Sequence, residues 1–206
     1  MHPTQRIQTL NQLRHLVFCG PEPIRVRFKD RYKTGLVTEA AKIRPRNGCD
    51  PVTFTTNVVI RNLARRIQAL NTEMASIDDM LSKLVAATAP SLLALHGVGL
   101  DSAATLLVTA GDNPDRLQSE GSWAHLCGVA PLPASTGKTP RHRLNRGGDR
   151  QANAALYRIV LTRMSNHPET RRYVTRRRDE GRNTTEIMRS LKRYVARHVF
   201  KHLQMA

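Results

Sequence analysis

The chain has 206 residues and a formal net charge of +17 at pH 7, and aromatic residues make up only 4% of it. A chain of this length can bury one or two cores, which aliphatic side chains must here fill. The charge favours a polyanionic partner, either nucleic acid or an anionic membrane surface. No apolar run reaches the roughly 18 to 20 residues that span a bilayer, and no signal peptide is evident. We therefore expect a nucleic-acid partner and no membrane.

Positive charge is concentrated in the last third of the chain. Residues 1–90 contain 14 basic and 7 acidic residues, residues 91–137 contain 1 and 4, and residues 138–206 contain 18 and 5. The last segment therefore carries +13 of the +17. A surface of this kind binds phosphates without reading base sequence. A merely solvated surface would have more acidic residues interspersed.

The first 49 residues predict one helix and a basic linker. Apolar residues between Gln5 and Cys19 fall mostly on one helical face, and the glycine and prolines of residues 20–23 end the run. Residues 24–49 mix basic and apolar side chains, with a short helix expected at residues 36–43. This linker either contacts nucleic acid or is simply solvated.

A long helix is predicted over residues 50–88, because Asp50 and Pro51 provide an N-cap and a first-turn proline. Apolar residues recur along it at alternating steps of three and four, and this seam consists of Ile60, Leu63, Ile67, Leu70, Met74, Ile77, Leu81 and Leu84. The 3.5-residue period is typical of a coiled coil and predicts a homodimer or higher oligomer through residues 60–84. The alternative is an intramolecular hairpin, with the first helix packed on the seam.

Two glycines, Gly97 and Gly99, stand between an apolar helix end and the polar cap of a second helix. This spacing is typical of a helix-hairpin-helix element, because glycine permits the tight turn. The backbone N–H groups at the start of the second helix can then hold a phosphate. A plain pair of antiparallel helices has the same sequence pattern.

A loop rich in hydroxyl groups follows a short helix predicted at residues 123–131. The loop, residues 132–140, contains Ser135 and Thr136 and too many helix breakers to be regular. Clustered arginines come directly after it, and Asp149 can cap the next helix. Such a loop could place a hydroxyl against a phosphodiester, with guanidinium groups stabilising the developing charge. The alternative is that both hydroxyls only satisfy backbone groups of the loop.

The C-terminal segment adds two more helices. Residues 169–180 are dense in arginine, and the spacing of Asn183 and Glu186 matches a capping box for a final amphipathic helix. We therefore expect an all-α fold. A coiled-coil helical arm, residues 50–88, leads into a compact helical domain, residues 89–206, that contains the helix-hairpin-helix-like element.

Metal and nucleotide sites are not indicated. The three cysteines are far apart, which argues against a disulfide framework or a zinc site and for a reducing cytoplasm. Gly137-Lys138-Thr139 matches the end of a phosphate-binding loop, but position 132 is leucine where that loop needs glycine. The acidic residues show no arrangement suited to divalent cations. We expect this chain to bind no metal or other cofactor by itself.

Four motifs in this order resemble the transposases of the insertion-sequence-110 family. They are Leu95-His96-Gly97-Val98-Gly99, Cys127-Gly128-Val129-Ala130-Pro131, Ser135-Thr136-Gly137-Lys138 and Arg143-Leu144-Asn145-Arg146-Gly147-Gly148-Asp149-Arg150. The resemblance is to the family's C-terminal transposase domain and covers about residues 88 to 200. The stretch before it resembles the family's coiled-coil region. Each motif alone is weak, but their order is specific.

The resemblance implies a mobile-element recombinase in which this domain supplies a nucleophilic serine. That serine corresponds to Ser135, and Thr136 is the second candidate because many members have two serines before the glycine. The residues expected to hold DNA are Gly97, Gly99, Lys138, Arg141, Arg143, Arg146 and Arg150.

The resemblance also implies partners for this chain. A structured guide RNA would direct the choice of target, and a RuvC-type domain would supply the acidic ligands for Mg²⁺. The sequence shows no counterpart of that domain, and it begins in the way expected of an entry partway through a longer protein. A cytoplasmic, nucleoid-associated bacterial location is implied as well.

Two functions follow from these expectations. In the first, the chain is the part of a transposase whose Ser135 attacks a DNA phosphate, and it binds DNA and a guide RNA. In the second, it is a catalytically inactive fragment that binds nucleic acid and dimerises. The two differ in whether a covalent protein–DNA link ever forms. Because the family's site is understood to need both domains, we expect the isolated chain to bind DNA without transposing it.

Overall fold

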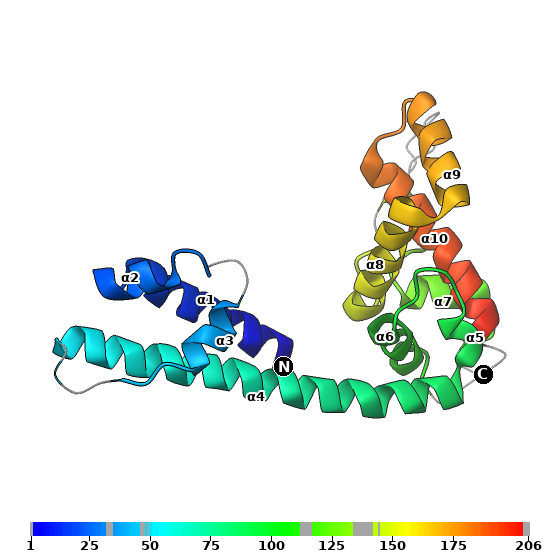
Figure 1. Cartoon of the computed structure of the whole chain (residues 1–206). Coiled ribbons are helices and arrows are strands. Elements are labelled where there is room, and N and C mark those ends of the chain that lie inside the picture. The colour runs from blue at the N-terminus through cyan, green and yellow to red at the C-terminus, as the bar shows by residue number, and fades with distance from the viewer. Residues whose placement is uncertain are drawn as a thin grey trace. The chain divides into compact units, whose positions relative to one another are not determined.

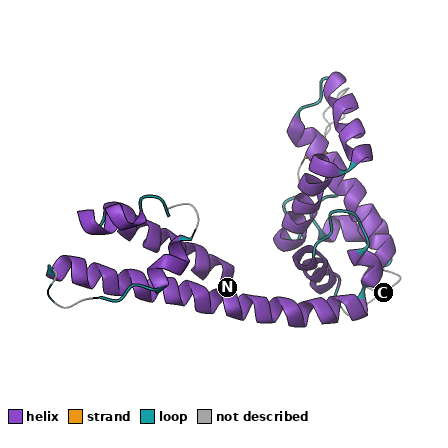
Figure 2. Ribbon diagram, viewed as in Figure 1, coloured by secondary structure: helices purple, strands orange, loops and turns teal. Residues whose placement is uncertain are grey.

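The computed structural model describes residues 2–31, 35–45, 48, 50–111, 117–133, 142–143 and 145–203. Helices make up almost all of its regular structure (Figure 2), which confirms the prediction of an all-α fold. The elements are α1 (His2–Cys19), α2 (Glu22–Phe28), α3 (Leu36–Ala41), α4 (Pro51–Thr88), α5 (Pro90–Leu93), α6 (Leu100–Ala110), α7 (Glu120–Leu126), β1 (Leu132–Pro133), β2 (His142–Arg143), α8 (Arg150–Asn166), α9 (Pro168–Asp179) and α10 (Thr184–Leu203). The chain divides into two compact units, residues 1–79 and residues 80–206.

The long helix α4 has the predicted bounds and the predicted cap. The Asp50 carboxylate accepts a hydrogen bond of 3.0 Å from the backbone N–H of Thr53, which satisfies a donor that the first turn leaves without a partner. Pro51 occupies the first helical position, where its missing N–H costs nothing. At the other end, Pro90 starts the separate short helix α5.

The core of the first unit covers the first half of the predicted seam. Helices α1, α2 and α3 pack on the N-terminal part of α4 (Figure 1), and Ile60 and Ile67 of α4 are buried among them. The buried residues of this core are Leu13, Val17, Ile24, Phe28, Leu36, Ala40, Ile43, Ile60, Ala64 and Ile67. For this half of the seam the structure shows the intramolecular alternative, because the chain's own helices cover it.

The second half of the seam is more open. Ile77 is 40% exposed and Leu84 is 65% exposed, and Met80 beside them is also exposed. Leu81, in contrast, packs against the core of the second unit. The coiled-coil prediction therefore stays a prediction, and it is confined to the part of α4 beyond Leu70, which is itself buried.

The second unit is built around α6, α8 and α10. Helix α8 packs against both α6 and α10, and α7 packs against α10 (Figure 1). The single tryptophan, Trp123 of α7, is fully buried in this core together with Leu106 and Leu156. Helices α7 and α8, between which the hydroxyl-rich loop lies in the sequence, therefore both pack on α10.

One helix was not predicted. Residues 22–28 form α2, although the sequence suggested only a basic linker there. Only two of its residues, Ile24 and Phe28, are buried, and they are one helical turn apart. Two buried positions are too few to show the 3.6-residue period from which a helix is predicted. No helix in the described part of the chain is long and apolar enough to cross a membrane.

Candidate nucleic-acid interface

The hydroxyl-rich loop is closed at its base by a pair of short strands. Leu132 pairs with Arg143 and Pro133 with His142 in an antiparallel ladder, so residues 134–141 connect two hydrogen-bonded strands. The predicted site residues Ser135, Thr136, Lys138 and Arg141 fall within that connection and lie outside the described residues. The structure therefore describes how the ends of this β1–β2 hairpin are held.

The C-terminus of α7 is capped by the segment that leads into α8. The side chain of Asn145 donates to the carbonyl of His125 at 3.2 Å, and the backbone N–H of Asp149 donates to the carbonyl of Leu126 at 2.7 Å. The last turn of a helix leaves its carbonyls without an intrahelical partner, and the His125 carbonyl also accepts from the backbone N–H of Gly128 at 3.0 Å. The donors, Asn145 and Asp149, follow β2, and the acceptors, His125 and Leu126, precede β1. These hydrogen bonds therefore join the segment before the hairpin to the segment after it.

Two glycines make this connection sterically possible. Gly128 has φ +65°, the left-handed conformation that commonly ends a helix. Gly148 lies directly against it, and a Cβ atom on Gly148 would overlap the backbone of Gly128. Backbone contact this close permits only glycine at position 148.

Two hydrogen-bonded side chains connect α8 to α10, and we call this pair the clasp: Asn153 of α8 and Lys192 of α10. The amide of Asn153 donates to the carbonyls of Cys127 and Gly128 at 2.9 and 3.1 Å. Its oxygen accepts from Lys192 Nζ at 2.8 Å. Neither residue was predicted from the sequence. A signal was available for Lys192, since it interrupts the apolar stripe of α10 one turn after the buried Met188.

The surroundings of Cys127 make its thiol a poor nucleophile. Burial, together with the nearby carboxylate of Asp149, raises the pKa of Cys127 to about 12. The thiolate, which is the nucleophilic form, is therefore scarce at neutral pH. Cys127 acts as a packing residue of the core rather than as a candidate nucleophile.

Three of the predicted arginines surround the foot of the hairpin. Arg143, Arg146 and Arg150 are all exposed, and none forms an ion pair within the residues the structure describes. Arg150 begins α8, whose N-terminus carries the positive end of the helix dipole. The foot of the hairpin thus offers three exposed guanidinium groups to an anion, whereas the N-terminus of α8 is already capped by the carboxylate of Asp149.

The Gly97 turn has a packing role that the sequence did not reveal. Gly97 has φ +81°, and a Cβ there would lie 3.2 Å from the carbonyl oxygen of Ile159 on α8. Next to it, the buried Arg163 donates from Nε to the His96 carbonyl at 2.8 Å. These contacts fasten the turn to α8.

Gly99 is placed differently from Gly97. It is exposed and directly precedes α6, whose first turn contains the carboxylate of Asp101. That charge opposes a phosphate at this helix start. The helix-hairpin-helix element and its phosphate site therefore stay predictions.

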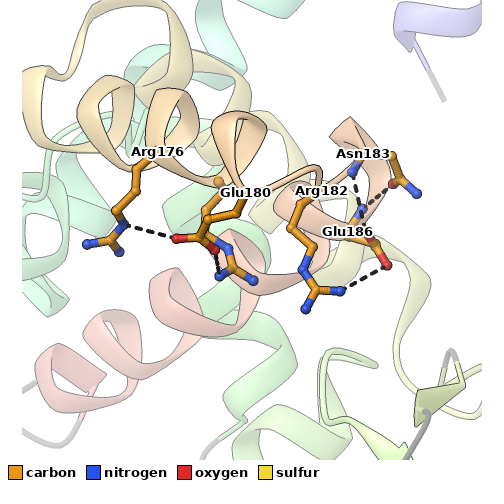
Figure 3. A network of polar contacts seen from close by, with 6 residues as sticks. Arg176, Glu180, Arg182, Asn183 and Glu186 are labelled. Atoms are coloured by element: carbon orange, nitrogen blue, oxygen red, sulfur yellow. Dashed lines mark hydrogen bonds and ion pairs between the residues drawn. The ribbon is translucent and has the colours of Figure 1, made fainter. Parts of the chain in front are cut away.

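Helix α9 and the turn after it carry further basic side chains. Figure 3 shows Arg176 paired with Glu180 and Arg182 paired with Glu186. Arg177 also pairs with Glu180. Asn183 and Glu186 exchange backbone-to-side-chain hydrogen bonds of 3.2 and 2.9 Å, so the predicted capping box is confirmed.

The other arginines of α9 have no such partners. Arg171, Arg172 and Arg178 are exposed and form no ion pair among the described residues. They extend the basic surface beyond the residues that the motifs had singled out.

The acidic side chains in the described part of the chain do not converge on a metal site. Asp149 caps α8, and Glu120 pairs with Arg193 and Arg197 of α10. Within those residues no group of three or more His, Cys, Asp or Glu side chains could hold a metal ion. The residues that the structure describes do not fit the Mg²⁺ that the family implies.

Known proteins match the part of the chain that contains this interface. Residues 89–175 match the family model described as Transposase IS116/IS110/IS902 family. The chain is 30% identical over 146 residues to the insertion element IS110 uncharacterized 43.6 kDa protein of Streptomyces coelicolor, covering 69% of this chain and 36% of that protein. It is 28% identical over 138 residues to the insertion element IS900 uncharacterized 42 kDa protein of Mycobacterium paratuberculosis, covering 66% and 35%.

The aligned part of the chain thus spans about a third of the length of these relatives. The matched domain begins before the Gly97 turn, includes the β1–β2 hairpin and all of α8, and ends within α9. Residues 89–175 therefore form a transposase domain of the IS116/IS110/IS902 family.

Proposed function

We propose that the second unit binds DNA and that Ser135 is the nucleophile of a transposition reaction. The observation that carries the proposal is the set of exposed arginines, Arg143, Arg146 and Arg150, at the foot of the hairpin in which Ser135 lies. Guanidinium groups pair with phosphate through charge-assisted, often bidentate hydrogen bonds. A hydroxyl held among them is suited to attack a phosphodiester.

The chemistry proposed is a transesterification at phosphorus. The Ser135 Oγ–H bond breaks and its proton passes to solvent, while Oγ forms a bond to phosphorus. The bond from phosphorus to one nucleotide oxygen breaks, and that oxygen takes up a proton to leave as a free hydroxyl. Arginine side chains at the foot of the hairpin stabilise the negative charge that builds on the phosphoryl oxygens. Thr136 is the second candidate for the attacking group.

Other parts of the proposal concern the grip on DNA and the partners. Lys138 and Arg141 would add to the phosphate clamp, and Gly97 and Gly99 would hold backbone farther along. The free arginines of α9 enlarge the basic surface. A structured guide RNA and a RuvC-type domain that holds Mg²⁺ complete the proposed assembly, and both come from the family resemblance. When bound by the acidic residues of that domain, Mg²⁺ would act as a Lewis acid on phosphoryl oxygens of the DNA.

The test is a covalent trap on a denaturing gel. The chain is incubated with labelled DNA from the ends of the element that encodes it, with RNA transcribed from those ends and with a separately supplied RuvC-type domain. Wild type is compared with Ser135→Ala and Thr136→Ala. We expect a shifted protein–DNA band with wild type and Thr136→Ala and none with Ser135→Ala.

The remaining outcomes separate the alternatives. A band lost only in Thr136→Ala would move the nucleophile to the threonine. If none of the three proteins forms a band, yet all bind DNA with an affinity that falls steeply as salt rises, the chain is a binding module. Specific cleavage by the chain alone would contradict the expectation that it needs a second domain.

The binding module is a second candidate function because of the exposed apolar residues of α4. Ile77, Met80 and Leu84 lie in or beside the second half of the seam and are 40%, 55% and 65% exposed. A second copy of the chain could cover them through coiled-coil packing. In this proposal the chain dimerises and occupies DNA without cutting it.

A further inference from the structure

Lys192 is a buried cation in an otherwise apolar part of α10. Its side chain is only 8% exposed, and its neighbours Met188, Leu191 and Ala196 are buried core residues. No carboxylate pairs with it in the described part of the chain, and residues 134–141 contain no Asp or Glu. Burying an ammonium group without an opposite charge is unfavourable for folding.

The direction of its pKa shift agrees with that cost. Burial, and then the nearby Arg189, lowers the pKa of Lys192 below its ordinary value. The unfolded chain, where the pKa is ordinary, therefore holds this proton more tightly than the folded chain. By linkage, Lys192 lowers the stability of the fold at neutral pH, and the penalty eases as the pH rises toward the ordinary lysine value. Methionine at this position would carry no such penalty.

The hydrogen bond that Lys192 makes leads to the hairpin. Lys192 Nζ donates to the oxygen of Asn153, and the amide nitrogen of Asn153 donates to the carbonyls of Cys127 and Gly128. A cation on the oxygen of an amide polarises the amide and strengthens the bonds that its N–H groups donate. These bonds hold the segment that leads into β1, and Gly148, in the segment that follows β2, packs directly against Gly128.

We propose that Lys192 is a positioning residue: through Asn153 it holds both ends of the β1–β2 hairpin, and so sets how the loop presents Ser135, at a cost in the stability of the fold. The role in presenting Ser135 rests on the proposed function. The role in holding the hairpin does not, because it follows from contacts within the described residues.

The experiment compares Lys192→Met with the matched control Lys201→Met on the full chain. Both changes remove one lysine from α10, but Lys201 is exposed in the last turn and outside the clasp. Three quantities are measured: the melting temperature, amide hydrogen exchange across residues 126–133 and 145–153, and the rate of the covalent DNA adduct in the supplemented trapping assay.

We expect Lys192→Met to melt at the same temperature as wild type or higher. Exchange in the two segments should rise about tenfold or more, since losing a charged hydrogen bond favours local opening by at least that factor. The adduct should form at least about tenfold more slowly, with a DNA affinity equal to that of Lys201→Met. Lys201→Met should match wild type in exchange and in adduct rate.

A second variant, Asn153→Asp, tests the other link of the clasp. Aspartate can form an ion pair with Lys192, which keeps α8 and α10 together, but it has no N–H to donate to Cys127 and Gly128. We expect a folded protein with the same faster exchange and slower adduct formation as Lys192→Met.

Several results would overturn the proposal. If exchange stays at the wild-type rate in both variants, Lys192 does not hold the hairpin. A clear fall in the melting temperature of Lys192→Met would make the residue an ordinary stabilising contact. Faster exchange with an unchanged adduct rate would remove the positioning role. Absence of any adduct with wild type is a different failure, since it refutes the proposed function while the exchange data still decide on the clasp.

Discussion

At the scale of single residues, Gly148 and Gly128 decide how closely the start of α8 approaches the end of α7. Gly148 has no room for a Cβ atom, because the atoms it would meet are backbone atoms of Gly128 and Leu126. Backbone cannot rotate away as a flexible side chain can, so the fold itself must shift. Gly147, its neighbour, would place a Cβ no closer than 3.5 Å, against a side-chain oxygen.

This contrast predicts opposite outcomes for two adjacent substitutions. Gly148→Ala should lower the free energy of unfolding by about 3 kcal/mol or prevent folding, since overpacking against rigid neighbours is costly. Gly147→Ala, the matched control, should change it by no more than about 0.5 kcal/mol. Urea denaturation followed by circular dichroism gives both values. Equal stability of the two variants would show that the glycine contact is looser than described.

At the scale of elements, the start of α8 depends on one capping side chain. The Asp149 carboxylate accepts a hydrogen bond of 2.7 Å from the backbone N–H of Ala152. The same residue donates its own backbone N–H to Leu126, so it joins α7 to α8. Asp149 therefore both caps α8 and makes a tertiary contact with α7. It directly follows the basic run at the foot of the hairpin.

Removal of this cap should be measurable and specific. Asp149→Ala is expected to lower the free energy of unfolding by about 1 kcal/mol, because an N–H of the first turn loses its acceptor. Asp149→Asn should stay close to wild type, since asparagine caps helices about as well. Thermal melts of the three proteins test this, and a loss in the asparagine variant equal to that in the alanine variant would point to the charge instead.

At the scale of the whole molecule, charge and exposed apolar surface suggest two kinds of partner. The net charge of +17 favours nucleic acid, whose binding weakens with salt through counterion release. The exposed residues of α4, Ile77 and Leu84, stand seven residues apart, which is one heptad of a coiled coil. A second copy of the chain would supply the matching surface.

The oligomeric state follows as a prediction. Light scattering at micromolar concentration should give wild type about twice the chain mass of 23.1 kDa. The variant Ile77→Glu/Leu84→Glu should be monomeric, because charges on a seam repel across the pair. Val108→Glu is the control, since Val108 is also apolar and 82% exposed but lies on α6. A monomeric wild type would count against dimerisation through α4.

The sequence by itself determined the features that depend on neighbours three or four residues apart. The caps at Asp50 and Asp149, the capping box of Asn183 and Glu186 and the bounds of α4 all follow from such local spacing. The family was also readable, because its motifs are short and ordered along the chain. The irregular loop predicted over residues 132–140 was wrong at its start, where Leu132 and Pro133 form β1, and its remainder lies outside the described residues.

Only the tertiary structure decided which surfaces meet. The seam of α4 looked uniform in sequence, but the first half is covered by the chain's own helices, whereas Ile77 and Leu84 of the second half are exposed. Lys192 reaches Asn153 across 39 positions of sequence, and no local spacing encodes that pairing. Periodicity shows which face of a helix is apolar but not what covers it, because burial depends on segments far away in the chain. For the same reason Gly97 looked like part of a phosphate-binding turn, and only its contact with Ile159 and Arg163 revealed a packing role.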